Sequence, residues 1–156
     1  MHSSQLSLLI VEDDEDLGFS LAEFFRDYEF FVDTALSGAE ALAKLKVDPL
    51  PHVVLLDEGM PGMSGLEVLR QIRSAERLRR LPVIVMSGSP PPPAQCSPWF
   101  QKPFDTSRLL EAVRNLVDKV MQDTAIHPLV ALPEARGTAA EDSQRSDGPS
   151  LNSGPC

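Results

Sequence analysis

The chain is poor in cysteine and short of positive charge. Its only cysteines, Cys96 and Cys156, lie far apart and lack the spacing of metal ligands. This count indicates neither a disulfide framework nor a zinc site, and it fits a reducing cytoplasm. Lysine and arginine together number 14, against 23 aspartate and glutamate residues, which gives a formal net charge of −9. A general binder of nucleic acid or of anionic membranes is therefore disfavoured, because both attract basic surfaces.

The sequence also lacks the features of a targeting segment or of a DNA-binding module. The opening stretch MHSSQLSLLIVEDD has no basic start and meets acidic residues after a short apolar run. It therefore predicts neither a signal peptide nor a membrane span. No helix-turn-helix or zinc-finger pattern occurs in the chain. We expect a cytoplasmic protein with one compact domain and no direct contact with nucleic acid or membrane.

Short apolar runs alternate with amphipathic segments along most of the chain. The runs are rich in aliphatic and β-branched residues, as in parallel strands that are buried on both faces. They cover residues 6–11, 30–34, 53–56 and 82–86, with a shorter candidate at residues 99–101. Segments with apolar side chains at helical spacing lie between them, at residues 16–27, 37–46 and 64–76. The patterns Ser37-x-x-Glu40 and Ser64-x-x-Glu67 are capping boxes and predict two of the helix starts.

The C-terminal part of the chain differs in character from the rest. Asp105 is a candidate cap for a final helix, whose apolar stripe runs from Leu109 to Val120. We place the end of the folded domain at residue 121, so that the domain covers residues 1–121. Residues 122–156 are rich in Pro, Gly, Ser and Ala and show little periodicity, which predicts a disordered tail. A tail of this length and composition cannot form a DNA-binding domain.

The order of the elements predicts an α/β fold built on a doubly wound parallel sheet. Parallel strands need crossover connections, and right-handed crossovers place helices on both faces of the sheet. Ligands then bind beyond the carboxyl ends of the strands. The polar side chains at those ends are Glu12 and Asp13 after the first run, Asp57 after the third, Ser87 after the fourth and Lys102 after the fifth. We expect these side chains to share one crevice.

The carboxylates in this crevice indicate a metal site. Glu12, Asp13 and Asp57 would repel one another unless a cation lay between them, and hard oxygen ligands favour Mg²⁺ or Mn²⁺ over zinc. A lysine and a hydroxyl nearby suit an incoming phosphoryl group. Asp57 is then able to act as a nucleophile that forms an acyl phosphate. The acids at residues 14–16 are interpreted as solvated loop charges.

Four motifs occur in a specific order along the chain: LLIVEDDEDL, VVLLDEGMPGMSGLEVLRQIR, VIVMSG and WFQKPF. Together they resemble the receiver domain of two-component response regulators, over about residues 6–121. The resemblance implies the flavodoxin-like fold of that family, a five-stranded parallel sheet in the order 2-1-3-4-5. It also implies a signalling domain that is not an enzyme in the usual sense, since it catalyses only its own phosphorylation and dephosphorylation.

The resemblance assigns roles to residues that follow the first and third strands. Asp57 matches the phosphorylated aspartate in the family's D-x-x-M-P pattern. Glu12 and Asp13 match the acidic pair that binds Mg²⁺, and Gly59 would offer its backbone carbonyl to the same metal. The phosphoryl group would come from a histidine kinase or a phosphotransfer protein.

It also assigns roles near the last two strands. Ser87 matches the family's switch hydroxyl, and Lys102 matches its phosphate-binding lysine. Trp99 occupies the aromatic switch position three residues before that lysine, where the family usually has Tyr or Phe. The Lys102–Pro103 peptide bond matches one that is usually cis in the family, a form accessible chiefly before proline.

The stretch between the fourth and fifth strands departs from the family. Four consecutive prolines at residues 90–93 forbid a helix where the family's fourth helix is expected. A helix would use roughly 11 residues to recross the sheet, which is all of residues 88–98, whereas polyproline II at about 3.1 Å per residue needs roughly six. We therefore predict that the fourth helix is missing or reduced to a turn. An apolar strip near Trp99 would then bind a downstream protein partner or a second copy of the chain, unless the prolines seal it.

Two functions remain open on the sequence. The first is a phosphorylatable switch that accepts a phosphoryl group on Asp57 and signals through protein–protein contact. The second is a receiver-fold scaffold or interaction module in which phosphorylation is lost or uncoupled from output. A flavin-binding protein of similar topology is disfavoured, since the first loop is acidic where a flavin phosphate needs amide and hydroxyl donors. A haloacid-dehalogenase-type phosphatase would need a second acid two residues after the nucleophile, where this chain has Gly59.

Overall fold

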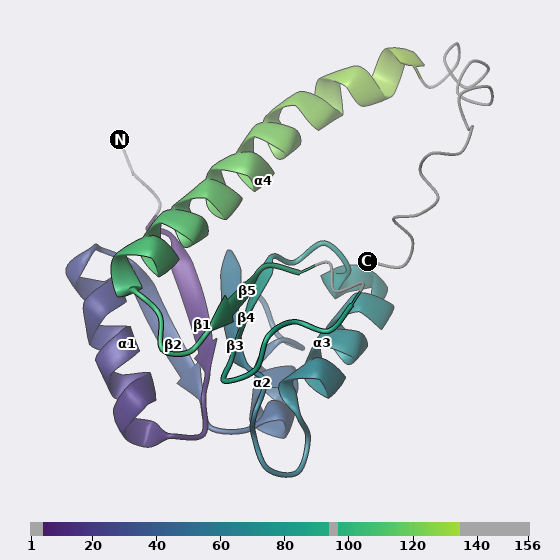
Figure 1. Ribbon diagram of the computed structural model, residues 1–156. Helices are drawn as coiled ribbons and strands as arrows, with labels where there is room; N and C mark the ends of the chain where they lie inside the picture. Colours follow the sequence, from purple (N-terminus) through teal and green to yellow (C-terminus); the bar gives the residue numbers. More distant parts are fainter. Residues whose placement is uncertain (1–4, 94–96, 135–156) are drawn as a thin grey trace.

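The core of the protein is a five-stranded parallel sheet (Figure 1). The structure is a computed structural model, and it describes residues 5–93 and 97–134. The strands are β1 (Ser7–Val11), β2 (Phe31–Ala35), β3 (Val53–Asp57), β4 (Val83–Ser87) and β5 (Trp99–Gln101). Their order is β2-β1-β3-β4-β5, and each neighbouring pair is parallel. The doubly wound sheet predicted from the sequence is confirmed.

Helices cover both faces of this sheet. They are α1 (Glu15–Asp27), α2 (Gly38–Lys44), α3 (Gly65–Ser74) and α4 (Thr106–Glu134), with a short 3-10 turn, η1 (Glu76–Leu78). One hydrophobic core joins α1 and α4 to the sheet, and a second core joins α2 and α3 to the opposite face. Figure 1 shows α1 and α4 on one side of the strands and α3 on the other. None of the helices within the described residues is long and apolar enough to span a membrane.

The strands are apolar because both of their faces are buried. In β1, Leu8 and Ile10 belong to the core under α1 and α4, whereas Leu9 and Val11 belong to the core under α2 and α3. This alternation follows from the pleat, which points successive side chains to opposite faces. Every residue of β3 and of β4 is buried. The continuous apolar runs in the sequence therefore correspond to central strands of a parallel sheet.

Serine side chains cap the starts of α2 and α3. Ser37 accepts a hydrogen bond from the amide of Glu40, and Ser64 accepts one from the amide of Glu67, as the capping patterns predicted. The reciprocal bond of the first box is shifted by one residue, because the carboxylate of Glu40 accepts from the amide of Leu36 at 2.8 Å. The glutamate thus satisfies the amide that precedes the cap, and both helix starts are positioned by local hydrogen bonds.

Aspartate side chains cap the starts of the other two long helices. Asp14 accepts from the amides of Asp16 and Leu17 at the start of α1. Asp14 is exposed, as a solvated charge is, and it has in addition a capping role that the sequence interpretation did not include, because a carboxylate at a helix start satisfies amides that have no partner within the helix. Asp105 accepts from the amide of Ser107 at 2.8 Å and caps α4, as predicted.

The connection between β4 and β5 contains no helix within its described residues, 88–93 and 97–98. For this part of the chain, the prediction that the fourth helix is missing is confirmed. Residues 90–93 are exposed, and Trp99 is half-buried against the core under α2 and α3. The Trp99 indole nitrogen donates a 2.8 Å hydrogen bond to the carbonyl oxygen of Ser89. The surface near Trp99 is therefore partly covered. The sequence had left two alternatives, an apolar strip open to a partner and a strip sealed by the prolines, and the structure lies between them.

The last helix, α4, is longer than predicted. It continues to Glu134, through residues 122–134, where the sequence predicted irregular chain. A helix that has already formed adds residues without a new nucleus, so the stretch after the packed part can follow it as helix. Figure 1 shows this second half of α4 extending away from the sheet. The rest of the expected tail, residues 135–156, lies outside the described residues, so the domain boundary stays a prediction.

Candidate functional site

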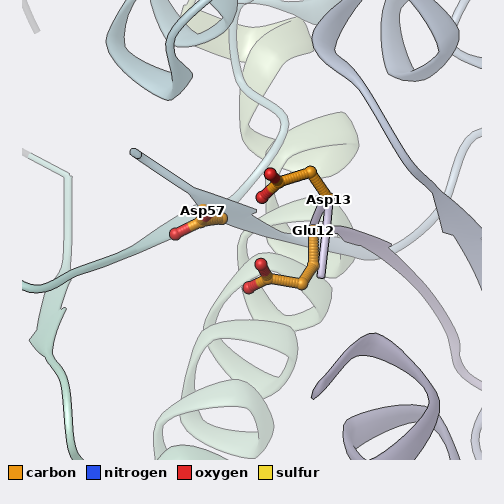
Figure 2. Close-up of side chains that lie close together, drawn as sticks. All are labelled: Glu12, Asp13 and Asp57. Atoms are coloured by element: carbon orange, nitrogen blue, oxygen red, sulfur yellow. The ribbon is translucent and has the colours of Figure 1, made fainter. Parts of the chain in front are cut away.

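Three carboxylates lie together at the carboxyl ends of β1 and β3. Glu12 and Asp13 directly follow β1, and Asp57 is the last residue of β3, so two neighbouring parallel strands bring them to one edge of the sheet. One oxygen of each carboxylate lies within 4.8 Å of the others (Figure 2). Glu12 is 3% exposed and Asp57 is 4% exposed, whereas Asp13 faces solvent. Two of the three acids are therefore largely removed from water.

Lys102 supplies a positive charge to this cluster. Its Nζ atom lies 3.0 Å from Asp57 Oδ1 and 3.3 Å from Glu12 Oε1. Burial alone would lower the pKa of Lys102, but the hydrogen bonds and charges of Asp57 and Glu12 outweigh this effect and raise the pKa above its usual value. The lysine is therefore protonated at neutral pH and bridges the two buried acids.

The charges at this site do not balance. The pKa of Glu12 is raised to about 7, and desolvation by burial is the main cause. The negative charge of Asp57 raises this pKa further, whereas the hydrogen bond from the backbone amide of Asp14 and the interactions with Lys102 lower it. One ammonium group faces three carboxylates, so a further cation would be stabilised here. Carboxylate oxygens are the hard ligands that Mg²⁺ and Mn²⁺ prefer. The donor set thus fits a divalent metal ion.

The loop after β3 holds Asp57 in place. Met60 is buried in the core under α2 and α3 and anchors the loop to the domain. Gly62 has a φ of 79°, a left-handed conformation that glycine adopts without strain. Gly59 lies two residues after Asp57 and is exposed, so its backbone is open to a ligand. The D-x-x-M-P pattern therefore combines an acid, an open backbone and an apolar anchor.

Ser87 ends β4 and is only 1% exposed. The amide of Lys102 donates a 2.6 Å hydrogen bond to the carbonyl oxygen of Ser87, so the pairing of β4 with the end of β5 joins the two residues. The Ser87 hydroxyl donates to Glu58 Oε1 at 3.2 Å and accepts from the amide of Ser89 at 3.0 Å. Sequence reasoning missed both partners. For Glu58, its position directly after Asp57 was the feature that could have identified it.

Trp99 is linked to the crevice through Ser89. The carbonyl oxygen of Ser89 accepts the indole hydrogen bond, and its amide donates to the Ser87 hydroxyl. A short chain of contacts therefore runs from the end of β4 to the aromatic side chain at the start of β5. The Lys102–Pro103 peptide bond is cis, as the resemblance implied.

Comparison with known proteins identifies the family. The model of the response regulator receiver domain matches residues 8–114, which is more than half of the chain. The chain belongs to this family. A response regulator receiver protein of Anaeromyxobacter sp. (strain Fw109-5) is 40% identical over 109 residues, which cover 68% of this chain and 43% of that protein. The receiver domain spans about half the length of the curated relatives it matches.

Solved receiver domains share its fold. A CheY-like receiver domain protein of Methanospirillum hungatei JF-1 has a TM-score of 0.70 at 23% identity, over 77% of this chain and 99% of that one. The response regulator TrrA of Thermotoga maritima, solved in complex with Mg²⁺-BeF, has a TM-score of 0.65 at 28% identity, over 72% of this chain and 99% of that one. The receiver fold is therefore retained here although the described residues between β4 and β5 contain no helix.

Proposed function

We propose that this receiver domain is a phosphorylatable signalling switch. Asp57 would accept a phosphoryl group from the phosphohistidine of a sensor histidine kinase or a phosphotransfer protein, in the cytoplasm. The observation that carries the proposal is the 3.0 Å contact between Lys102 Nζ and Asp57 Oδ1, in a cluster where this one ammonium group faces three carboxylates. A metal ion would offset the excess negative charge of this crevice, and the metal ion and Lys102 would together stabilise a phosphoryl group.

The metal would be held by carboxylates and one backbone group. Asp13 and Asp57 would offer carboxylate oxygens, Glu12 would add its charge, and Gly59 would add its carbonyl oxygen. When bound, Mg²⁺ or Mn²⁺ neutralises phosphoryl oxygens as charge develops on them. The structure of TrrA in complex with Mg²⁺-BeF supports this proposal, because that relative is 28% identical to this chain.

The chain's own residues would carry the transfer. A carboxylate oxygen of Asp57 forms a bond to phosphorus while the phosphorus–nitrogen bond of the donor histidine breaks, and the histidine nitrogen keeps the electron pair of that bond. The ammonium group of Lys102 pairs with the transferred group as a point charge. The Ser87 hydroxyl, now directed to Glu58, turns to donate a hydrogen bond to a phosphoryl oxygen. No general base is needed, because a carboxylate oxygen carries no proton that must be removed before it attacks phosphorus.

Output would pass to a protein partner or a second copy of the chain, without direct contact with nucleic acid. A second function, the receiver-fold scaffold, is favoured by one observation, the absence of a helix from the described residues between β4 and β5. In the family, that helix belongs to the surface through which phosphorylation is commonly relayed. A scaffold would bind its partner with the same affinity whether or not Asp57 carried a phosphoryl group.

Intact-mass spectrometry tests the switch. The full chain is incubated with a small-molecule phosphodonor, such as acetyl phosphate or phosphoramidate, in the presence and absence of Mg²⁺. We expect the added mass of one phosphoryl group with Mg²⁺ present, little addition without it, and none in Asp57→Asn. The matched control is Asp33→Asn, which changes an exposed aspartate on β2 and should be labelled like the wild type. A wild type that stays unmodified with every donor would contradict the proposal.

A further inference from the structure

The segment at residues 90–93 has a conformation that its own residues impose. Proline fixes φ near −65° and has no amide hydrogen, so the four prolines take no part in a helix or a sheet ladder. Each proline that precedes another is also steered away from the helical region towards extended values of ψ. Residues 90–92 are therefore set in a polyproline II conformation before any partner binds, and Pro93 lies in a turn. All four residues of the segment are exposed.

The segment begins at a residue that is tied to the candidate site. Ser89, which directly precedes Pro90, donates its amide hydrogen to the Ser87 hydroxyl at 3.0 Å. Its carbonyl oxygen accepts the Trp99 indole hydrogen at 2.8 Å. One residue thus connects the exposed prolines with the buried hydroxyl at the end of β4 and with the half-buried aromatic ring on β5.

The requirements of the connection do not explain four exposed prolines. An extended return from β4 to β5 needs length, and polar residues in an extended conformation would supply it equally well. Four pyrrolidine rings instead present an apolar ridge to solvent, at the place where the family's fourth helix would stand. Segments of this kind dock in grooves lined by aromatic side chains, and they lose little conformational entropy because their shape is already set.

We propose that the segment at residues 90–93 is a docking site for a protein partner with an aromatic-lined, proline-binding groove. Through Ser87, the position of this segment would depend on whether Asp57 is phosphorylated. The docking half stands by itself, whereas the dependence on Asp57 rests on the proposed function. The Ser87 hydroxyl has one hydrogen to donate, and it now donates to Glu58 while it accepts from Ser89. When the Ser87 side chain rotates to direct its hydroxyl to a phosphoryl group on Asp57, its oxygen moves and the Ser89 amide loses its acceptor. The residue that anchors the proline segment then changes its position.

Isolated proline-binding domains test the docking half. The full-length protein is titrated by calorimetry with a panel of WW, SH3 and EVH1 domains, each up to about 1 mM, so that a binding free energy as weak as about −4 kcal/mol is still detected. We expect at least one domain to bind, and the double variant Pro91→Ala/Pro92→Ala to weaken that binding by about tenfold or more. The matched control is Pro98→Ala, because Pro98 is a lone exposed proline in the same connection. It should bind within about twofold of the wild type.

Thermal unfolding and Trp99 fluorescence verify that each variant is folded. Failure of every domain to bind, or binding that survives the double replacement, would overturn the docking half. The probe and the variants are compared in unphosphorylated protein, so this result does not depend on whether Asp57 can be labelled.

The same titration with phosphorylated protein tests the dependence on Asp57. The extent of labelling is measured by intact mass in each sample, so a failure of labelling is recognised separately from a failure of coupling. We expect phosphorylation to change the affinity for the bound domain by about threefold or more in the wild type, and to leave it unchanged in Ser87→Ala. The amide resonance of Ser89 and the indole resonance of Trp99 should shift in the wild type only. Equal affinities in fully labelled and unlabelled wild type would overturn the coupling.

Discussion

Gly65, the first residue of α3, lies directly against the backbone of Asp57, the last residue of β3. A Cβ atom added at Gly65 would come within 2.6 Å of the Glu58 Cα and still closer to the Asp57 carbonyl oxygen. The amide of Gly65 also donates a 3.0 Å hydrogen bond to the carbonyl oxygen of Glu58. The start of the helix and the proposed phosphoacceptor are therefore in direct backbone contact.

The first prediction concerns this contact. Gly65→Ala should destabilise the protein by about 1–3 kcal/mol, because the backbone of β3 or of α3 must move to admit a methyl group. Labelling of Asp57 should slow at the same time. Urea unfolding measures the stability, and Gly59→Ala is the control, since a Cβ added there meets nothing within 4 Å. Equal stability of the two variants would show that the contact is relaxed in solution.

The second prediction separates two roles of Lys102. In Lys102→Met, Mg²⁺ should bind about tenfold more tightly, a change of about 1.4 kcal/mol, because the ammonium group no longer competes for Asp57 and Glu12. Phosphorylation should nevertheless slow by about tenfold or more, because the transferred group loses its cationic partner. Calorimetric titration with Mg²⁺ and time-resolved intact mass measure the two effects.

The control for Lys102 is Lys46→Met, which removes an exposed lysine just after α2. It should leave both Mg²⁺ affinity and labelling near their wild-type values. If Lys102→Met instead weakened Mg²⁺ binding, the lysine would be supporting the geometry of the acids and not opposing their charge.

The third prediction concerns pH. The pKa of Glu12 is about 7 in the folded protein, above its ordinary value of 4.5, and desolvation is the main cause. Between these values the folded state holds a proton that the unfolded state releases, so the contribution of Glu12 to stability is present below pH 4.5 and is lost as pH rises towards 7. Without divalent metal, this loss should amount to about 1–3 kcal/mol. Glu12→Gln should not show it.

Denaturant unfolding of both proteins across this pH range, with a chelator present, measures the difference. The comparison of the two proteins isolates the part of the pH dependence that requires the Glu12 carboxylate. A difference between wild type and Glu12→Gln that stays constant from pH 4.5 to 7 would mean that Glu12 ionises normally in the fold.

The fourth prediction concerns the open edge of the sheet. Among the described strands, β2 lies at the edge of the sheet next to β1, and its residues Val32 and Thr34 turn their carbonyl groups outward. Arg26 Nη2 donates to Val32 O at 3.1 Å, and Lys44 Nζ donates to Thr34 O at 2.9 Å. These side chains occupy the acceptors that a second strand would use, beside Phe31, which is 63% exposed.

The double variant Arg26→Ser/Lys44→Ser should therefore self-associate more strongly, and light scattering over a range of concentrations should show a rising mean mass. Arg70→Ser/Lys46→Ser is the control, because it removes the same charge from exposed positions on α3 and just after α2. Identical masses for the two double variants would mean that edge pairing is blocked in some other way.

The fold and the meeting of the site residues could be predicted because both follow from strand ends. Central strands of a parallel sheet are apolar along their whole length, so Asp57 and Ser87 were conspicuous as the first polar residues after buried runs. The absence of a helix from the described residues between β4 and β5 could be predicted too, since proline restricts the backbone whatever surrounds it. In each case a local property of the sequence determined the result.

Other contacts could not be predicted because they depend on three-dimensional placement. His52 accepts a 3.0 Å hydrogen bond from the amide of Ser7, so it joins the start of β1 to the chain before β3, although the two residues are far apart in sequence. The bond from Ser87 to Glu58 likewise depends on the pairing of β3 with β4. The extension of α4 depends on the balance between helix and coil. For residues 122–134 the composition predicted irregular chain, whereas the structure has helix.

Every side chain that the proposed chemistry uses stands at a strand end or in the loop after β3, and none comes from residues 88–98. The length and composition of this connection can therefore change during evolution while the reaction stays the same. Lineages could exchange one partner for another by replacing this single segment, without any change at Asp57. For protein engineering, the same separation marks residues 90–93 as a grafting position, where a peptide epitope can be placed beside an unaltered phosphorylation centre.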